Sequence, residues 1–185
     1  IVIGCVIIIP IIIVVVLAIV GFKYVKDNDI DIKEYIEESA TMKGTIGDTL
    51  SSNDVKITLT DALIYSRIEG EAFTDTPAEG KEYLVFFFNV ENIDDENNFV
   101  SIHNFTGYVD DTLVASKILI NNVDNVQYLS ADLTPGKKAR GYVAYEVDTN
   151  WKQFDIHYKE NSFDYNDSMI FTVVNEENNQ NNNNA

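Results

Sequence analysis

Residues 80–92 read GKEYLVFFFNVEN, and this stretch decides the fold. Alternate residues fall on opposite faces of a β-strand, so the segment can be divided into two faces. One face carries Leu84, Phe86, Phe88 and Val90, and the other carries Tyr83, Val85 and Phe87. Because a strand that is apolar on both faces belongs in the middle of a sheet, residues 80–92 are predicted to form a central strand.

Other segments with a period of two surround this strand in the sequence. In DVKITLTDALIYSRI (54–68), Val55, Ile57 and Leu59 alternate with polar residues. The same alternation recurs in RGYVAYEVD (140–148), KQFDIHYKE (152–160) and MIFTVVN (169–175). Turn residues separate these runs, among them Pro77 with Gly80, and Pro135–Gly136 in a predicted type II turn. Seven or eight short strands with no second helical segment predict an all-β domain of two packed antiparallel sheets over residues 44–175.

The order of several segments resembles a known family. They are GDTLSSNDVKITLTDA, GKEYLVFFFNVEN, NFTGYVDD, DLTPGKKARGYVAYEV and FDIHY. Together they resemble the bacterial domain of unknown function 4352, which is similar to telokin and to mycobacterial immunoprotective antigens in having an immunoglobulin-like sandwich. The resemblance implies an exported domain held by a lipid or a helix, in some members behind an intracellular zinc ribbon. It implies no catalytic residues.

Residues 1–22 are predicted to form a transmembrane helix. The stretch has no charged residue, and fifteen of its 22 positions are Ile or Val. At 1.5 Å per residue such a helix is about 33 Å long, enough to cross a hydrocarbon core of about 30 Å. The VIGC motif ending at Cys5 imitates a lipoprotein cleavage site, but a lipid-bearing cysteine is followed by polar residues, and here the apolar run continues. We interpret Cys5 as a membrane-buried residue, and the missing initiator Met indicates that an upstream part is absent.

Residues 23–43 are predicted to be an acidic juxtamembrane linker or short helix. Asp27, Asp29, Asp31 and Glu38 have the spacing of calcium ligands in a helix–loop–helix site. Ile32, however, occupies the position where that loop needs a glycine. A helix that begins at Asp31 with a capping box explains the same residues better. At the other end of the chain, the Asn-rich residues 176–185 are predicted to be a disordered tail.

Composition restricts the function. The formal net charge is −17, which excludes nucleic acid as a partner and disfavours docking on anionic lipid. No cysteine follows Cys5, so disulfides, thiolate zinc sites and cysteine catalysis are excluded from the rest of the chain. Carboxylates in two predicted loops are candidate calcium ligands if the loops meet at one end of the sandwich. These are Asp94, Asp95, Asp110 and Asp111.

No catalytic or cofactor-binding residue is predicted. The two histidines, His103 and His157, lack metal-ligand spacing, and no nucleophile elbow, P-loop or dinucleotide fingerprint is present. The main hypothesis is a single-pass, membrane-anchored, extracytoplasmic module that binds a protein or envelope component without chemistry. One alternative is a calcium-stabilised adhesion or sensor domain. The other is a hydrolase that uses His103.

Overall fold

The structure is a computed structural model that describes residues 41–160 and 169–176. The predicted transmembrane helix at 1–22, the linker up to residue 40 and the tail from residue 177 lie outside these ranges, and their predictions stay predictions. Among the described residues, no helix has the length and apolar character needed to cross a bilayer.

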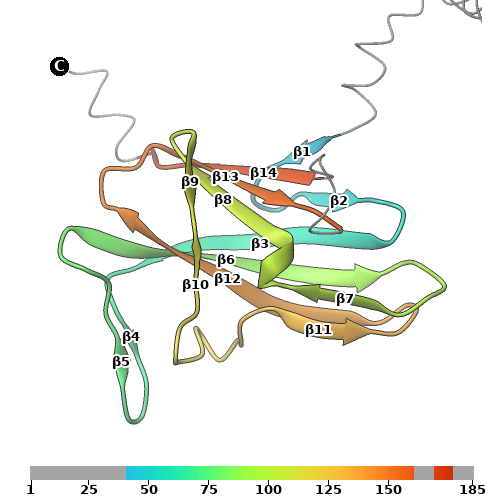
Figure 1. Cartoon of the computed structure of the whole chain (residues 1–185), viewed down its shortest axis with the longest axis horizontal. Coiled ribbons are helices and arrows are strands. Elements are labelled where there is room, and N and C mark those ends of the chain that lie inside the picture. Colours follow the sequence, from blue (N-terminus) through green and yellow to red (C-terminus); the bar gives the residue numbers. More distant parts are fainter. Residues whose placement is uncertain (1–40, 161–168, 177–185) are drawn as a thin grey trace, which may run out of the picture. The chain divides into compact units, whose positions relative to one another are not determined.

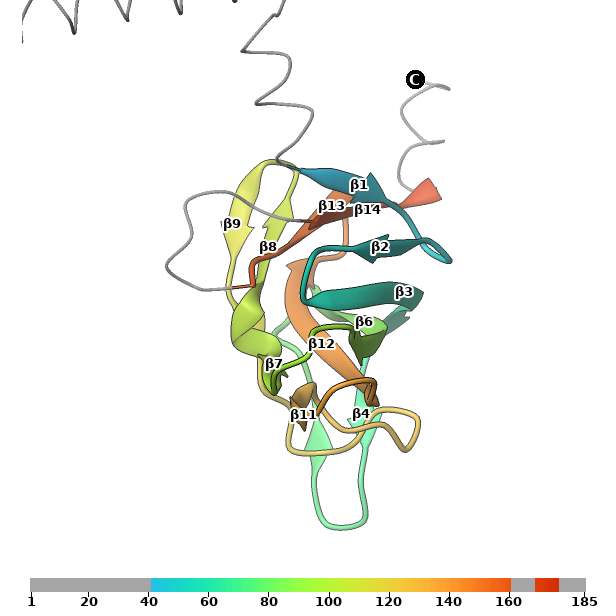
Figure 2. The ribbon, with the colours of Figure 1, turned by 90° about the vertical axis from the view of Figure 1, so that its right-hand side faces the viewer.

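Two five-stranded sheets pack face to face, as Figures 1 and 2 show from two directions. The first sheet has the order β10 (Ser116–Lys117), β12 (Lys138–Asp148), β6 (Lys81–Asn92), β3 (Val55–Tyr65) and β2 (Thr49–Ser51). The second has the order β1 (Met42–Gly44), β14 (Met169–Val174), β13 (Gln153–Tyr158), β8 (Phe105–Val109) and β9 (Thr112–Val114). The predicted all-β sandwich is therefore confirmed.

Shorter elements complete the described part of the domain. β7 (Asn98–Ser101) pairs with β11 (Ser130–Leu133), and β4 (Ile68–Glu69) pairs with β5 (Thr74–Asp75). A 3-10 turn, η1 (Ile102–Asn104), joins β7 to β8. Strand β1 pairs in parallel with β14, and its first two residues, Met42 and Lys43, lie in the range predicted as linker, so the described sandwich includes them.

Strand β6 lies in the middle of its sheet, as its sequence predicts. It pairs with β12 from Lys81 to Glu91 and with β3 from Tyr83 to Asn92, both antiparallel. Its inner residues Phe86 and Phe88 are fully buried against aromatic rings of the opposite sheet. Phe86 meets Phe154 with ring centroids 4.9 Å apart, and Phe88 meets Phe105 at 4.7 Å. These contacts form the core between the sheets.

A second apolar cluster lies on the outer face of β6. Here Val85 and Phe87 are also buried, at 0% and 2% exposed. Their cover comes from residues 118–129 between β10 and β11, which we call the flap. The flap contributes Leu119, Val123 and Val126 to this second cluster. The apolar character of both faces of β6 thus has a physical reason, since each face is buried in its own core.

The flap is an ordered segment with its own hydrogen bonds. Val123 and Val126 exchange both backbone N–H···O bonds, at 3.0 and 2.8 Å, around a turn in which Asp124 and Asn125 both have positive φ. Leu129 then donates to the Tyr142 carbonyl of β12 at 2.8 Å and enters the inner core. Gly141 makes this close approach possible, because a Cβ there would lie 2.6 Å from the Leu129 Cα.

Truncating β6 on either face is expected to destabilise the domain by a similar amount. Phe86→Ala and Phe87→Ala should each lower the free energy of unfolding by about 3–5 kcal/mol, because both side chains are buried in packed cores. Urea unfolding of the two variants, with the exposed Phe73→Ala as the matched control, measures the difference. A Phe87→Ala variant as stable as the Phe73→Ala control would show that the flap does not form a core.

Candidate functional site

The hairpin formed by β4 and β5 projects from the sandwich, as both ribbon views show (Figures 1 and 2). Ile68 pairs with Asp75 and Glu69 with Thr74, and Gly70 donates to the Phe73 carbonyl at 3.0 Å to close the turn. Ile68 is buried and joins the second cluster, which holds the base of the hairpin on the sheet. The tip of the hairpin therefore projects from the domain, while its base is held on the sheet by Ile68.

The Asp75 carboxylate joins this hairpin to the flap. It accepts hydrogen bonds from the backbone N–H groups of Ile120 and Asn121, at 2.9–3.1 Å, and from the Asn121 side-chain amide at 2.9 Å. The same amide donates to the Phe73 carbonyl at 3.0 Å. A carboxylate that accepts several N–H bonds is a strong anchor, so the hairpin and the flap are held in a fixed relation.

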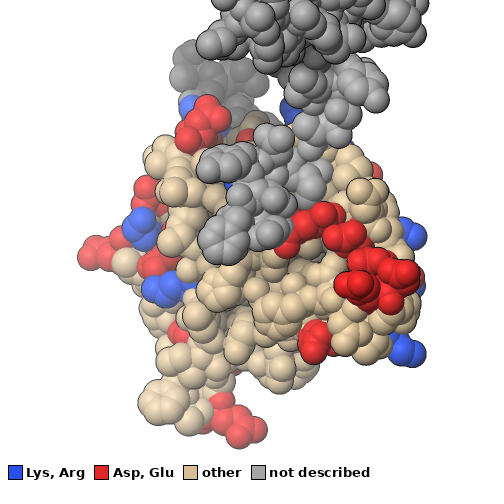
Figure 3. Space-filling model, turned by 45° about the vertical axis from the view of Figure 1, so that its right-hand side comes forward, with Lys and Arg blue, Asp and Glu red and all other residues tan. Residues whose placement is uncertain are grey.

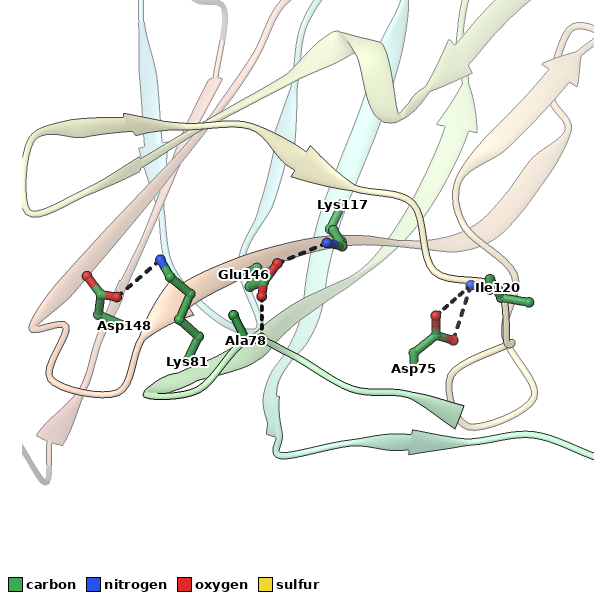
Figure 4. A network of polar contacts seen from close by, with 7 residues as sticks. All are labelled: Asp75, Ala78, Lys81, Lys117, Ile120, Glu146 and Asp148. Atoms are coloured by element: carbon green, nitrogen blue, oxygen red, sulfur yellow. Dashed lines mark hydrogen bonds and ion pairs between the residues drawn. The ribbon is translucent and has the colours of Figure 1, made fainter. Parts of the chain in front are cut away.

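Three large apolar side chains on these joined segments face solvent. Phe73 at the hairpin tip is 67% exposed, and Ile118 and Ile120 of the flap are 64% and 76% exposed. We call these three residues the hairpin–flap surface. Figure 4 shows Ile120 beside Asp75, with its side chain directed away from the carboxylate. Single exposed apolar residues are ordinary, but three of them on adjoining, mutually anchored segments mark a candidate contact surface.

Sequence reasoning missed this surface. The segment KILI (117–120) lies between the predicted strands, and its residues alternate between exposed Ile118 and Ile120 and buried Leu119. An apolar run next to the polar NN at 121–122 was the available signal. From the sequence alone, the side chains of this apolar run could not be assigned to a buried or an exposed face, because the segment covers β6, which is distant in the chain.

A second polar contact fixes the start of the flap (Figure 4). On β12, Glu146 accepts a hydrogen bond from the Ala78 backbone N–H at 2.7 Å and pairs with Lys117 of β10 at 2.9 Å. The bond from Ala78 and then the bond from Lys117 lower the pKa of the Glu146 carboxyl, and the partner carboxylate raises the pKa of Lys117. Glu146 thus holds two parts of the chain, the segment that leads into β6 and strand β10, which leads into the flap.

Two tyrosines of the first sheet, one on β3 and one on β12, donate hydrogen bonds to the flap. Tyr65 donates to the Asp124 carboxylate at 2.7 Å, and burial followed by this hydrogen bond raises the pKa of Tyr65. Tyr142 donates to the Asn121 carbonyl at 3.1 Å. Burial, with a smaller contribution from the Asp75 charge, raises the pKa of Tyr142 to about 12. Both hydroxyls therefore remain neutral donors at physiological pH.

In residues 66–80, which contain the hairpin, the carboxylates of Glu69, Glu71, Asp75 and Glu79 outnumber the one cation, Arg67. Glu69 and Glu71 of the hairpin are exposed, as is Glu79 in the segment that leads to β6. Arg67 is paired with Glu69 at 2.7 Å, and both side chains are about two-thirds exposed. Figure 3 shows carboxylates beside uncharged side chains at the lower tip of the domain, and a larger acidic patch higher on the same face.

The predicted calcium ligands do not come together. Asp94 and Asp95 follow β6, in a loop organised by the fully buried Asn92. The Asn92 amide donates to the carbonyls of Glu96 and Leu133, both at 2.7 Å, and its oxygen accepts from the Asp94 N–H at 3.0 Å. This loop lies where β6 ends and β12 begins, because Lys138 is the register partner of Glu91.

Asp110 and Asp111 lie at the opposite end of the sandwich. They form the predicted tight turn between β8 and β9, both with positive φ, and the Asp110 carboxylate accepts from the backbone N–H groups of Lys152 and Gln153 where β13 begins. The four carboxylates therefore do not form one site. In residues 41–160 and 169–176, no three His, Cys, Asp or Glu side chains are placed to hold a metal ion. Calcium binding itself is not tested by this arrangement and stays a prediction.

The histidines lie on different parts of the surface. His103 is exposed in η1, where its basic side chain lies in the last turn. His157 on β13 faces outward, with its ring 4.7 Å from that of Tyr108, and lines an open groove of about 450 Å³ on the outer face of the second sheet. Four strand tyrosines pack inside the domain, since Tyr83, Tyr142, Tyr145 and Tyr158 are at most 2% exposed.

The two packed sheets and their order place the described part of the chain in the class of immunoglobulin-like β-sandwich domains. Residues 44–180 match the family model described as Domain of unknown function (DUF4352), which covers more than half of the chain. The chain therefore belongs to this family, and the resemblance read from its sequence is confirmed. No curated protein matches the sequence.

Solved structures show the same fold at low sequence identity. A candidate lipoprotein of Bacillus subtilis, YcdA, matches with a TM-score of 0.56 at 15% identity, over 73% of this chain and 41% of that chain. The chain thus spans less than half of that structure. The secreted protein MPT63 of Mycobacterium tuberculosis matches with a TM-score of 0.53 at 13% identity, over 72% and 98%. A candidate lipoprotein of Staphylococcus aureus matches with a TM-score of 0.51 at 16% identity, over 70% and 90%.

The Glu146 contact predicts a pH-dependent part of the stability. Because the folded-state pKa of Glu146 is lowered, its ionised form stabilises the fold above the unfolded-state pKa near 4.5, and this contribution is lost as the pH falls through the folded-state value. Wild type should exceed Glu146→Gln in stability at pH 7 by up to about 1 kcal/mol, since the pair is partly screened. The difference should disappear towards pH 3.

Paired melting curves of wild type and Glu146→Gln from pH 7 to pH 3 measure this. The exposed Glu79→Gln is the control and should melt with wild type throughout. A difference between wild type and Glu146→Gln that stays constant down to pH 3 would contradict the role given to the ionised carboxylate.

Proposed function

We propose that this chain is a membrane-anchored, extracytoplasmic, non-enzymatic binding module that engages a protein partner through the hairpin–flap surface. The observation that carries the proposal is the exposure of Phe73, Ile118 and Ile120 on segments that Asp75 holds in place. The structural neighbours described as lipoproteins or secreted proteins support the extracytoplasmic location. The apolar residues 1–22 support the membrane anchor.

Rigidity favours binding at this surface. A contact surface that is already ordered loses less conformational entropy on association than a mobile loop does. The Asp75 bonds, the Tyr142 bond to Asn121 and the buried flap residues provide that order. An exposed aromatic residue with two aliphatic neighbours is also the composition of a small interface centre, and the polar residues around it form a rim.

Charge indicates the kind of partner. The carboxylates of Glu69 and Glu71, on the same hairpin as Phe73, repel anionic lipid headgroups and complement basic side chains. The partner that fits is a protein with an apolar patch and Lys or Arg residues around it. This assignment distinguishes the surface from a membrane-insertion tip, which needs basic rather than acidic neighbours.

Site-specific photo-crosslinking in the native cell tests the proposal. A photoreactive phenylalanine analogue at position 73 should give a discrete protein adduct, because that side chain lies at the centre of the proposed contact. The adduct should be lost in the Ile118→Ser/Ile120→Ser background, which removes the neighbouring apolar area and changes stability by less than about 0.5 kcal/mol.

The control position is Leu113 on β9, which is 65% exposed on the other sheet. The proposal predicts no such adduct from position 113. Adducts of equal yield from positions 73 and 113, or a position-73 adduct that survives the double substitution, would overturn it. A position-73 adduct formed with lipid instead of protein would overturn the assignment of the partner.

A further inference from the structure

The outer face of the first sheet has two halves. One half carries Phe87 and Tyr142 and is buried under the flap. The other half remains open as a groove of about 410 Å³ across β3, β6 and β12. Arg140 lies at the boundary, with its guanidinium carbon 6.0 Å from the centre of the Phe87 ring. The open half is therefore a defined surface that the flap leaves uncovered.

Strand register arranges polar side chains across this open half in two rows, which we call the polar grid. Cross-strand partners on one face have Cβ atoms roughly 5 Å apart, so long side chains within and between the rows are within reach of one ligand. The rows are Lys56–Glu91–Lys138 and Thr58–Asn89–Arg140.

The polar grid is positive in a strongly acidic chain. It holds three of the ten Lys and Arg side chains that the structure describes, and one carboxylate. That carboxylate, Glu91, is bound by Lys138 at 3.1 Å. In the described ranges, Lys56 and Arg140 form no ion pair. The grid thus has a local formal charge of +2, with two cations available to a ligand.

Hydroxyl groups border the cations on the β2 side. Ser51 is the register partner of Lys56, and Thr49 is the partner of Thr58, with the two threonine hydroxyl oxygens 2.8 Å apart. Asn89 adds an exposed amide between Thr58 and Arg140. Neutral hydrogen-bond donors and acceptors therefore lie beside the two available cations, Lys56 and Arg140. This arrangement suits a ligand with an anionic end and a hydroxylated body.

We propose that the polar grid binds a small hydroxylated phosphate ester, such as a sugar or polyol phosphate. The phosphate oxygens lie between Lys56 and Arg140, where a guanidinium and an ammonium supply charge-assisted hydrogen bonds. The hydroxylated body lies along Thr58, Asn89 and Ser51. The proposal is independent of the hairpin–flap surface, which lies beyond the covered half of the sheet.

The size of the ligand follows from the charge of the whole chain. A long polyanion or an anionic membrane would extend past the grid into the field of a chain with net charge −17 and be repelled. A single phosphate group keeps its charge within the positive area. The volume of the groove also lies in the range of small-molecule sites.

Amide NMR spectra of the full chain in an uncharged detergent test the proposal. Inorganic phosphate should produce saturable shifts confined to the grid strands, beyond those from sodium chloride at equal ionic strength. Glycerol phosphate should bind more tightly than inorganic phosphate. Lys56→Gln/Arg140→Gln should weaken binding by at least about tenfold, since both phosphate contacts are lost.

The matched control is Lys43→Gln/Lys81→Gln, which removes the same charge outside the grid, on β1 and at the opposite end of β6, and should leave the affinity unchanged. If both double variants weakened phosphate binding equally, the attraction would come from the overall charge of the chain, and the proposed site would be overturned. Shifts that do not saturate, or that sodium chloride reproduces, would overturn it as well. If inorganic phosphate and glycerol phosphate bound with equal affinity, the proposal that the ligand carries a hydroxylated body would be overturned.

Discussion

The burial of β6 on both faces is the constraint on which the rest of the described structure depends. A sandwich normally covers only the inner face of each sheet, yet Val85 and Phe87 are large apolar residues on the outer face. Leaving them in water would forfeit about 1.5–3 kcal/mol for each side chain. The chain covers them with the flap, and so the central strand requires a segment that no simple two-sheet sandwich needs.

The hairpin–flap surface and the polar grid both result from the way the flap covers the outer face of β6. The flap has to be anchored, and Asp75, Glu146 and Tyr142 anchor it to the projecting hairpin and to the sheet. While Leu119 is buried in the second core, Ile118 and Ile120 are left exposed, as is Phe73 on the hairpin that Asp75 joins to the flap. The flap also ends before it reaches Arg140, so the remaining part of the sheet face stays open as the polar grid.

Local patterns predicted the sandwich but not the surfaces. Alternation in 81–92 and 140–148 gave the long strands, and Gly136, with φ of 73°, takes the third position of the predicted turn from Thr134 to Lys137. The flap could not be predicted, because its packing depends on β6, a strand that ends 26 residues before the flap begins. Local patterns also do not determine whether the acidic loops at Asp94 and Asp110 meet, and strand direction sends them to opposite ends of the sandwich.

Hydrogen exchange of the flap amides tests the central claim most directly. The N–H groups of Val123, Val126 and Leu129 are bonded to backbone carbonyls, and those of Ile120 and Asn121 to the Asp75 carboxylate. If the flap is the cover of a true second core, these amides exchange slowly, with protection approaching that of β6. Exchange at the rate of an unstructured peptide, while β6 stays protected, would contradict the account.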